Sequence, residues 1–180
     1  MSNGAGLFAV AGDEPFMTKT IKALQQLGFD GPITTIASGF SAESIASLPK
    51  GLEGVVPITN LTADPSDPDA QLRDEVMANY GGSADTIFSS ITFMVVLGFV
   101  RATTGAPSAV DAGTIDAALS AMPTQLPLPL GGGITFRCGA KLVPLTPNAC
   151  ITSVLESTLD AEGKPTGTKI LDTTSIVTLG

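Results

Sequence analysis

The spacing of apolar residues changes twice near the start of the chain. A short apolar run at 7–11 is followed by apolar residues at helical spacing, and 32–37 is again a β-rich run; the helical face consists of Met17, Ile21, Leu24 and Leu27. Asp13 or Glu14 can cap this helix, and Gly28 suits its end. The pattern predicts a βαβ unit, in which a helix covers one face of two parallel strands.

The rest of the chain continues to alternate between helical and strand patterns. Helices are expected at 41–48, 69–80 and 111–122, and the second begins with Asp67 as its cap and Pro68 as its first residue. Strands are expected at 53–59 and 134–136, and a hairpin is expected to pair 151–160 with 168–174. This order predicts an α/β fold with a mostly parallel sheet and a carboxyl-terminal hairpin.

Two stretches differ from this alternation. Residues 85–104 contain the most apolar segment of the chain, which is too short to cross a bilayer, and we expect a helix buried on most of its sides. Residues 123–133 combine spaced prolines with a run of glycines, which favours an extended chain and a flexible joint. We therefore expect a hinge or linker at 123–133.

The predicted strands of the βαβ unit end beside residues that could contact a ligand. Gly12, Asp13 and Glu14 follow the first strand, and the second strand is followed by Ser38, Gly39 and Phe40. Open α/β sheets bind ligands at the carboxyl ends of their parallel strands, so these residues are candidates for a ligand site. Asp13 and Glu14 could pair with an amine or serve only as helix caps, and the two roles can coexist.

Composition and charge narrow the classes of function. The chain of 180 residues is 43% hydrophobic, carries a net charge of −8 and contains no histidine. The acidic balance argues against nucleic acid or an anionic membrane as a partner. Without histidine, Ser-His-Asp and Cys-His catalysis and imidazole metal sites are excluded, and we expect no catalytic residue, metal or cofactor. An acid-dependent enzyme that uses Asp13 with Glu14 is the enzymatic alternative.

Cys138 and Cys150 are the only cysteines, with eleven residues between them. An even count on either side of a loop is compatible with a disulfide, which would suit an exported protein. The chain offers no histidine or further cysteine to complete a zinc site. We expect the disulfide, and the alternative is a pair of buried free thiols.

Several segments occur in an order that is typical of one known family. They are 21–29, 51–56, the helix that ends at Asn79-Tyr80, 132–136, the cysteine pair and the turn at 160–167. In this order the chain resembles the carboxyl-terminal half of a type I periplasmic solute-binding protein. The resemblance is to the branched-chain amino acid family that feeds ABC importers, in particular to its actinobacterial members.

The resemblance implies two lobes with three α-β-α layers that close on a solute. Residues 1–57 and 134–180 would belong to the second lobe and 58–133 to the first, with hinge crossings near 57–60 and 123–133. It also implies that the amino-terminal half, with its signal peptide and lipoprotein anchor, is missing, and the start of this chain has no signal-like region. Faces exposed by that loss could make the chain self-associate.

The resemblance also places the ligand contacts. They would come from the loop before the first helix, from the end of the next strand and from the start of the long buried helix, here Gly12, Asp13 and Glu14, then Ser38, Gly39 and Phe40, then Ser90 and Thr92. Amino acid binders commonly carry an acidic residue where this chain has Ser38. The frequent Tyr-Asp pair at the start of the long helix is replaced by Ile91-Thr92.

The function implied is that of a non-enzymatic, extracytoplasmic binding protein. It would bind a small polar or amino-acid-like solute and present a surface to ABC permease subunits. A ligand-sensing domain of a signalling system with the same fold is the alternative.

Overall fold

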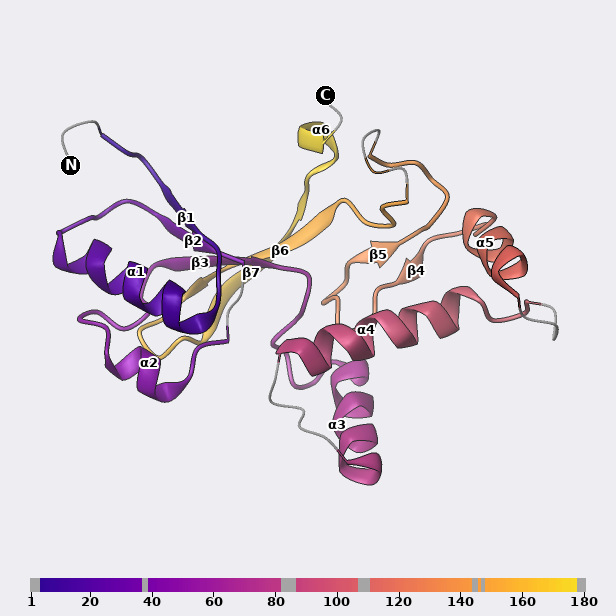
Figure 1. Cartoon of the computed structure of the whole chain (residues 1–180), viewed down its shortest axis with the longest axis horizontal. Coiled ribbons are helices and arrows are strands. Elements are labelled where there is room, and N and C mark those ends of the chain that lie inside the picture. Colours follow the sequence, from indigo (N-terminus) through magenta and orange to yellow (C-terminus); the bar gives the residue numbers. More distant parts are fainter. Residues whose placement is uncertain are drawn as a thin grey trace. The chain divides into compact units, whose positions relative to one another are not determined.

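The computed structural model describes residues 4–36, 39–81, 87–106, 111–143, 146 and 148–177 (Figure 1). The strands are β1 (Phe8–Val10), β2 (Ile33–Thr35), β3 (Val55–Thr59), β4 (Leu126–Pro127), β5 (Thr135–Phe136), β6 (Ser153–Leu159) and β7 (Pro165–Asp172). The helices are α1 (Glu14–Gln26), α2 (Ala42–Ala46), α3 (Pro68–Tyr80), α4 (Ile87–Ala102), α5 (Ala112–Ser120) and α6 (Thr174–Val177).

The chain divides into two compact units. Unit 1 consists of Met1–Thr59 and Leu155–Lys169, and unit 2 of Asn60–Val154 and Ile170–Gly180. The predicted lobes, 1–57 with 134–180 and 58–133, refer to the longer parent protein that the resemblance implies. That assignment and its hinge crossings stay predictions.

The main sheet confirms the predicted βαβ unit. β1 pairs with β2 in parallel, from Phe8 beside Ile33 to Val10 beside Thr35, and β2 pairs with β3 in parallel. β6 joins β3 in antiparallel register, and β7 completes the order β1-β2-β3-β6-β7. The chain therefore has the predicted mixed α/β fold, in which parallel strands are extended by a carboxyl-terminal hairpin.

The start and end of α1 follow from local side-chain chemistry. The Asp13 carboxylate accepts a hydrogen bond of 2.9 Å from the Phe16 N–H, and Pro15 occupies an early position at which an N–H would have no helical partner. After the helix, Gly28 adopts φ +71°, a left-handed conformation that glycine enters without steric cost. These signals lie within a few residues of each other, which is why the sequence predicted this helix.

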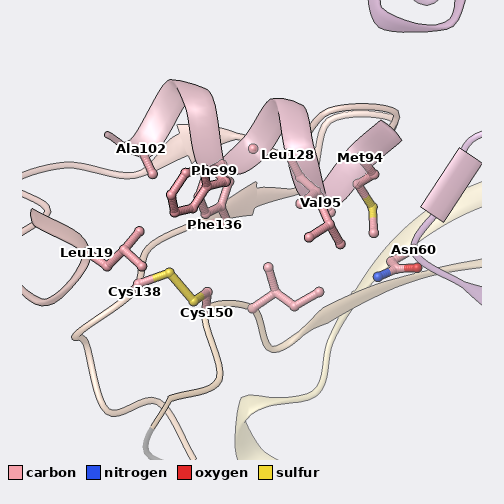
Figure 2. Close-up of a pocket in the computed structure, with 12 residues that line it drawn as sticks. Asn60, Met94, Val95, Phe99, Ala102, Leu119, Leu128, Phe136, Cys138 and Cys150 are labelled. Atoms are coloured by element: carbon pink, nitrogen blue, oxygen red, sulfur yellow. A yellow bond between two sulfur atoms is a disulfide. The ribbon is translucent and has the colours of Figure 1, made fainter. Parts of the chain in front are cut away.

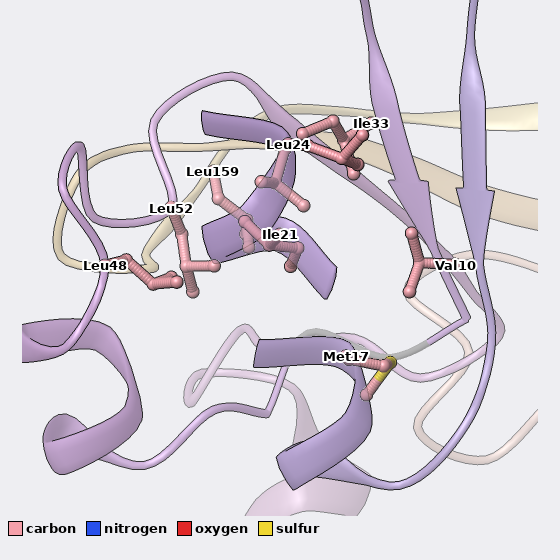
Figure 3. Packing of buried hydrophobic residues seen from close by; sticks show 9 residues of the cluster. Val10, Met17, Ile21, Leu24, Ile33, Leu48, Leu52 and Leu159 are labelled. Atoms are coloured by element: carbon pink, nitrogen blue, oxygen red, sulfur yellow. The ribbon is translucent and has the colours of Figure 1, made fainter. Parts of the chain in front are cut away.

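The core of unit 1 lies between α1 and one face of the sheet. Figure 3 shows Ile21 of α1 among Val10 and Ile33 of the strands and Leu52 and Leu159 of later segments. Of the predicted helical face, Met17, Ile21 and Leu24 are buried, but Leu27, which follows the end of α1, is 70% exposed. Of the three expected layers, the described part of unit 1 shows two, the sheet and the layer of α1 and α2.

In unit 2, α3 and α4 are joined by an ion pair and a small core. Asp67 caps α3, as predicted, by accepting from the Asp69 N–H at 2.8 Å. The two oxygens of the Asp69 carboxylate accept hydrogen bonds from the two terminal nitrogens of Arg101. These hydrogen bonds raise the pKa of Arg101. Ala70, Met94 and Leu130 form a buried cluster in this unit.

The expectation that the long apolar helix is buried on most sides is wrong. The buried residues of α4 form a single stripe, Ser90, Met94 and Gly98. The described part of unit 2 buries this stripe and half-buries Phe93 and Leu97, but it leaves many of the other apolar side chains of α4 exposed. No helix in the described ranges is both long and apolar enough to span a membrane.

The segment 123–133, for which we expect a hinge or linker, contains β4 and then a packed turn. β4 pairs with β5, and the Leu128 N–H donates to the Ile134 carbonyl at 2.8 Å. Leu130 is buried with φ +56°, and Pro129 is also fully buried. Leu128 and Leu130 supply apolar side chains. The free energy gained when they are buried outweighs the conformational entropy that the glycines lose. Whether the segment crosses between lobes stays a prediction.

Candidate functional site

The first group of predicted site residues lies at the amino end of α1. The Glu14 carboxylate reaches the start of α2, where its Oε1 accepts a hydrogen bond of 2.7 Å from the Ser41 N–H. Hydrogen bonds from the Ser44 and Ser41 side chains and from the Ser41 backbone lower the pKa of Glu14, so the group stays anionic. The structure thus brings Glu14 next to the segment that contains Gly39 and Phe40, at the carboxyl edge of the parallel strands.

The neighbours of Glu14 have mainly structural contacts. Asp13 caps α1, and a Cβ on Gly12 would lie 2.6 Å from Cδ1 of the Phe16 ring. The absence of a side chain at Gly12 therefore lets that ring pack against the loop. Phe40 is half-buried against the core of unit 1. Ser38 lies outside the described residues.

The second group of predicted site residues lies on α4, in unit 2. Ser90 is buried, and its Oγ accepts a hydrogen bond of 2.9 Å from Nη1 of Arg73. Thr92 is exposed and lines an apolar hollow of about 430 Å³ with Phe88 and Val96. Two positions apart on a helix, Ser90 and Thr92 point to different sides, and the structure does not bring them together.

A polar cavity of about 370 Å³ in unit 2 was missed by the sequence analysis. It is lined by Arg137 after β5 and by Asp172 at the end of β7, together with hydroxyl and amide side chains. Arg137 donates from Nε to the Met122 carbonyl at 3.0 Å, and hydrogen bonds from Thr174 lower the pKa of Asp172. A cation, an anion and hydroxyls suit a polar or zwitterionic group.

The sequence offered only a weak signal for this cavity. Arg137 directly follows a predicted strand and precedes Cys138, and the chain has only nine basic residues. Asp172, however, reaches the cavity through pairing of segments far apart in the chain. Within the described residues no group of three or more acidic, cysteine or histidine side chains could hold a metal ion.

A second cavity in unit 2, of about 260 Å³, is almost entirely apolar. Figure 2 shows Val95 and Phe99 of α4 facing it from one side, with Leu128 and Phe136 of the β4–β5 region and the Cys138–Cys150 disulfide among its walls. The bond confirms the predicted pairing of the two cysteines. The cavity lacks the polar groups that would orient a polar solute.

The sequence profile of periplasmic binding proteins matches residues 1–144. The chain belongs to the periplasmic binding protein family. No curated protein matches the sequence.

Solved structures of periplasmic binding proteins share this fold. The leucine-binding protein LivK from Thermotoga maritima is 15% identical with a TM-score of 0.62, and the match covers 94% of this chain and 45% of LivK. A branched-chain amino acid ABC transporter protein from Thermus thermophilus, solved with bound valine, is 16% identical with a TM-score of 0.63 over 97% of this chain and 49% of its own. The chain therefore spans about half the length of these relatives.

The ionised Glu14 of this periplasmic binding protein should make its stability dependent on pH. Because the folded-state pKa lies below the ordinary value of 4.5, the stabilisation is fully present above that pH and is lost as the pH falls through the folded-state pKa. Glu14→Gln should therefore reduce stability at neutral pH, and its difference from wild type should shrink under acid. Urea unfolding at descending pH measures this difference.

The exposed Glu53 provides the control for this measurement. Glu53→Gln should follow the wild-type pH dependence closely. If Glu14→Gln lost as much stability at acid pH as at neutral pH, the prediction would be contradicted. The carboxylate would then not hold α2 through its charge.

Proposed function

We propose that the chain is the carboxyl-terminal portion of an extracytoplasmic solute-binding component of an ABC importer. The observation that carries this proposal is the family match over residues 1–144. In the proposal, two lobes of the parent protein close on a small polar or amino-acid-like solute, no chemistry is performed, and the closed form is presented to ABC permease subunits. The names of the solved relatives, a leucine-binding protein and a protein with bound valine, support an amino-acid-like solute.

In this proposal, Glu14 supplies the charge that receives an amine of the solute. Its carboxylate is already ionised and fixed by Ser41, so it would lose little freedom on binding. Gly12, Asp13, Ser38, Gly39 and Phe40 would complete this side of the site. For unit 2, hydroxyl contacts of Ser90 and Thr92 of α4 with a solute stay a separate part of the proposal.

The proposal places the protein outside the cytoplasmic membrane. In the proposal, the signal peptide and a lipid anchor belong to the amino-terminal half of the parent. When that half is absent, the proposal expects the chain to bind solute weakly and to self-associate, because the surfaces that the half would cover are exposed.

The test is a thermal-shift screen of the full-length parent against amino acids and small polar metabolites. A ligand present at 100 times its Kd should stabilise the folded protein by about 2.7 kcal/mol. Glu14→Gln should weaken the binding of amine-bearing solutes by about tenfold or more, since a charge-assisted contact is lost. Glu53→Gln is the matched control.

The two parts of the proposal fail separately. If no solute in the screen stabilises the parent, the binding function is contradicted. If a solute binds equally well to wild type and to Glu14→Gln, the function stands and the assignment of Glu14 is wrong.

A further inference from the structure

The polar cavity of about 370 Å³ in unit 2 has no role in the proposed function. Its polar lining comes from segments that are far apart in the sequence: the β4–β5 region, the start of β6, and the end of β7 with the first residue of α6. All of the residues that line it belong to unit 2. The cavity therefore has a lining of its own, separate from the predicted site residues around Glu14 in unit 1.

Arg137 brings a positive charge to this cavity in a fixed position. Its backbone N–H donates to the Cys150 carbonyl at 2.8 Å, and its Nε donates to the Met122 carbonyl at 3.0 Å. Among the described residues, the two terminal nitrogens of Arg137 have no hydrogen-bond or ion-pair partner. A planar guanidinium with two free terminal nitrogens suits the two oxygens of a carboxylate.

Asp172 brings a negative charge, and its position is also fixed. Its Oδ1 accepts a hydrogen bond of 2.9 Å from the Thr174 N–H and one of 2.5 Å from the Thr174 hydroxyl. The Thr174 hydroxyl also shares a hydrogen bond of 2.9 Å with the hydroxyl of Thr152. The hydrogen bonds from Thr174 lower the pKa of Asp172, so the carboxylate is ionised at neutral pH. Its Oδ2 has no partner in the part of the chain that the structure describes.

The two charges line one cavity but do not pair with each other. The ion pairs within the described ranges join other residues, and none joins Arg137 to Asp172. Two opposite charges that keep free hydrogen-bonding atoms can both be contacted by one molecule that carries both signs. The side chains of Ala140, Leu142 and Ile151 also line the cavity and suit a short aliphatic chain between the charged ends of that molecule.

Two neutral side chains add hydrogen-bonding capacity. Gln125 accepts a hydrogen bond of 3.0 Å at its Oε1 from the Thr135 hydroxyl, and its amide N–H groups have no partner among the described residues. Ser153, the first residue of β6, is half-buried, and its hydroxyl has no partner in the same part of the chain. Both side chains line the cavity, and such neutral groups fix the orientation of a bound molecule.

We propose that this cavity is a binding site for a small zwitterion, whose carboxylate is held by Arg137 and whose ammonium group is held by Asp172. The site goes beyond the proposed function, because it uses none of the residues assigned there. A simple anion is disfavoured by Asp172 and by the net charge of −8, and a simple cation is disfavoured by Arg137. A zwitterion satisfies both charges and adds no net charge.

The test is a calorimetric titration of this chain with glycine, β-alanine and γ-aminobutyrate, which differ in the separation of their two charges. One of them should bind with one-to-one stoichiometry and more tightly than the others, because its length matches the cavity. Acetate with methylamine, propionate with ethylamine, and butyrate with propylamine carry the same charges on separate molecules. Each of these should bind about tenfold more weakly than the zwitterion that contains its charged group, because one charge-assisted contact is missing.

Arg137→Gln and Asp172→Asn should each weaken the binding of that zwitterion by about tenfold, because each removes one charge and keeps a polar side chain. Both residues are exposed, so the variants should fold, which urea unfolding checks. Asp116→Asn is the matched control, because Asp116 is exposed on α5 and does not line the cavity. In the wild type, nuclear magnetic resonance should show shifts of the amides of Thr152 and Ser153, which locates the ligand without any variant.

The proposal is overturned if none of the three zwitterions binds saturably, or if binding is unchanged in both Arg137→Gln and Asp172→Asn. It is also overturned if Glu14→Gln abolishes the binding and Asp172→Asn does not, because the ligand then occupies the predicted site in unit 1. That result leaves the proposed function intact. Conversely, binding that requires Arg137 and Asp172 and is unaffected by Glu14→Gln supports the cavity, even if the solute screen of the parent contradicts the transport function.

Discussion

Replacing Ile21 with alanine should lower the free energy of unfolding of unit 1 by about 3 kcal/mol. Ile21 is 0% exposed at the centre of α1 and packs in the cluster with Leu52 and Leu159. The substitution removes buried methyl groups and leaves a cavity, because the surrounding helix and strands relax only partly. Hydrogen exchange of amides in α1 and β2, followed as a function of urea, measures the change.

Leu27→Ala provides the comparison within the same segment, since this side chain lies just after α1 and is 70% exposed. Its effect should stay within about 0.5 kcal/mol. Ile21→Val should fall between the two at about 1 kcal/mol. Equal losses at positions 21 and 27 would contradict the packing of α1 on the sheet.

Several elements of the chain could be predicted because their signals are local. Asp13 and Gly28 mark the two ends of α1, and Asp67 followed by Pro68 marks the start of α3. Each signal depends on a backbone group within a few residues of the side chain, so sequence order alone carries it. The boundaries were less certain, and β7 begins at Pro165 rather than at the expected position 168.

Burial could not be predicted in the same way, because it depends on which segments lie beside a helix. For α1, most of the residues that cover its apolar face lie in neighbouring segments of the chain. On α3, by contrast, the large side chains Leu72 and Tyr80 are exposed, and α4 is buried only along one side. The apolar pattern of a helix therefore predicts that its surface requires cover, but it does not identify the segment that supplies the cover.

The candidate site shows the same division. The carboxyl edge of the sheet was predictable from strand order, and the structure places Glu14 there beside Ser41. The polar cavity with Arg137 and Asp172 depends on pairing between distant segments, which no local pattern in the sequence encodes.

Removing the disulfide should cost unit 2 about 3 kcal/mol of its free energy of unfolding. Cys138 and Cys150 are 12 positions apart, and closing a loop of this size restricts the unfolded chain. The test is Cys138→Ala combined with Cys150→Ala, measured by urea unfolding and by hydrogen exchange of amides in α4 and α5. A reductant should destabilise the wild type and leave the double variant unchanged.

The size of the two losses separates two explanations of this stabilisation. If the bond acts only on the unfolded chain, reduction and the double substitution should give the same loss, because both open the same loop. The sulfur atoms also form part of the wall of the apolar cavity beside Phe99 and Phe136, and only the substitution removes them. A larger loss in the double variant than in the reduced wild type would therefore measure the packing of the sulfurs, and no loss on reduction would contradict the loop argument itself.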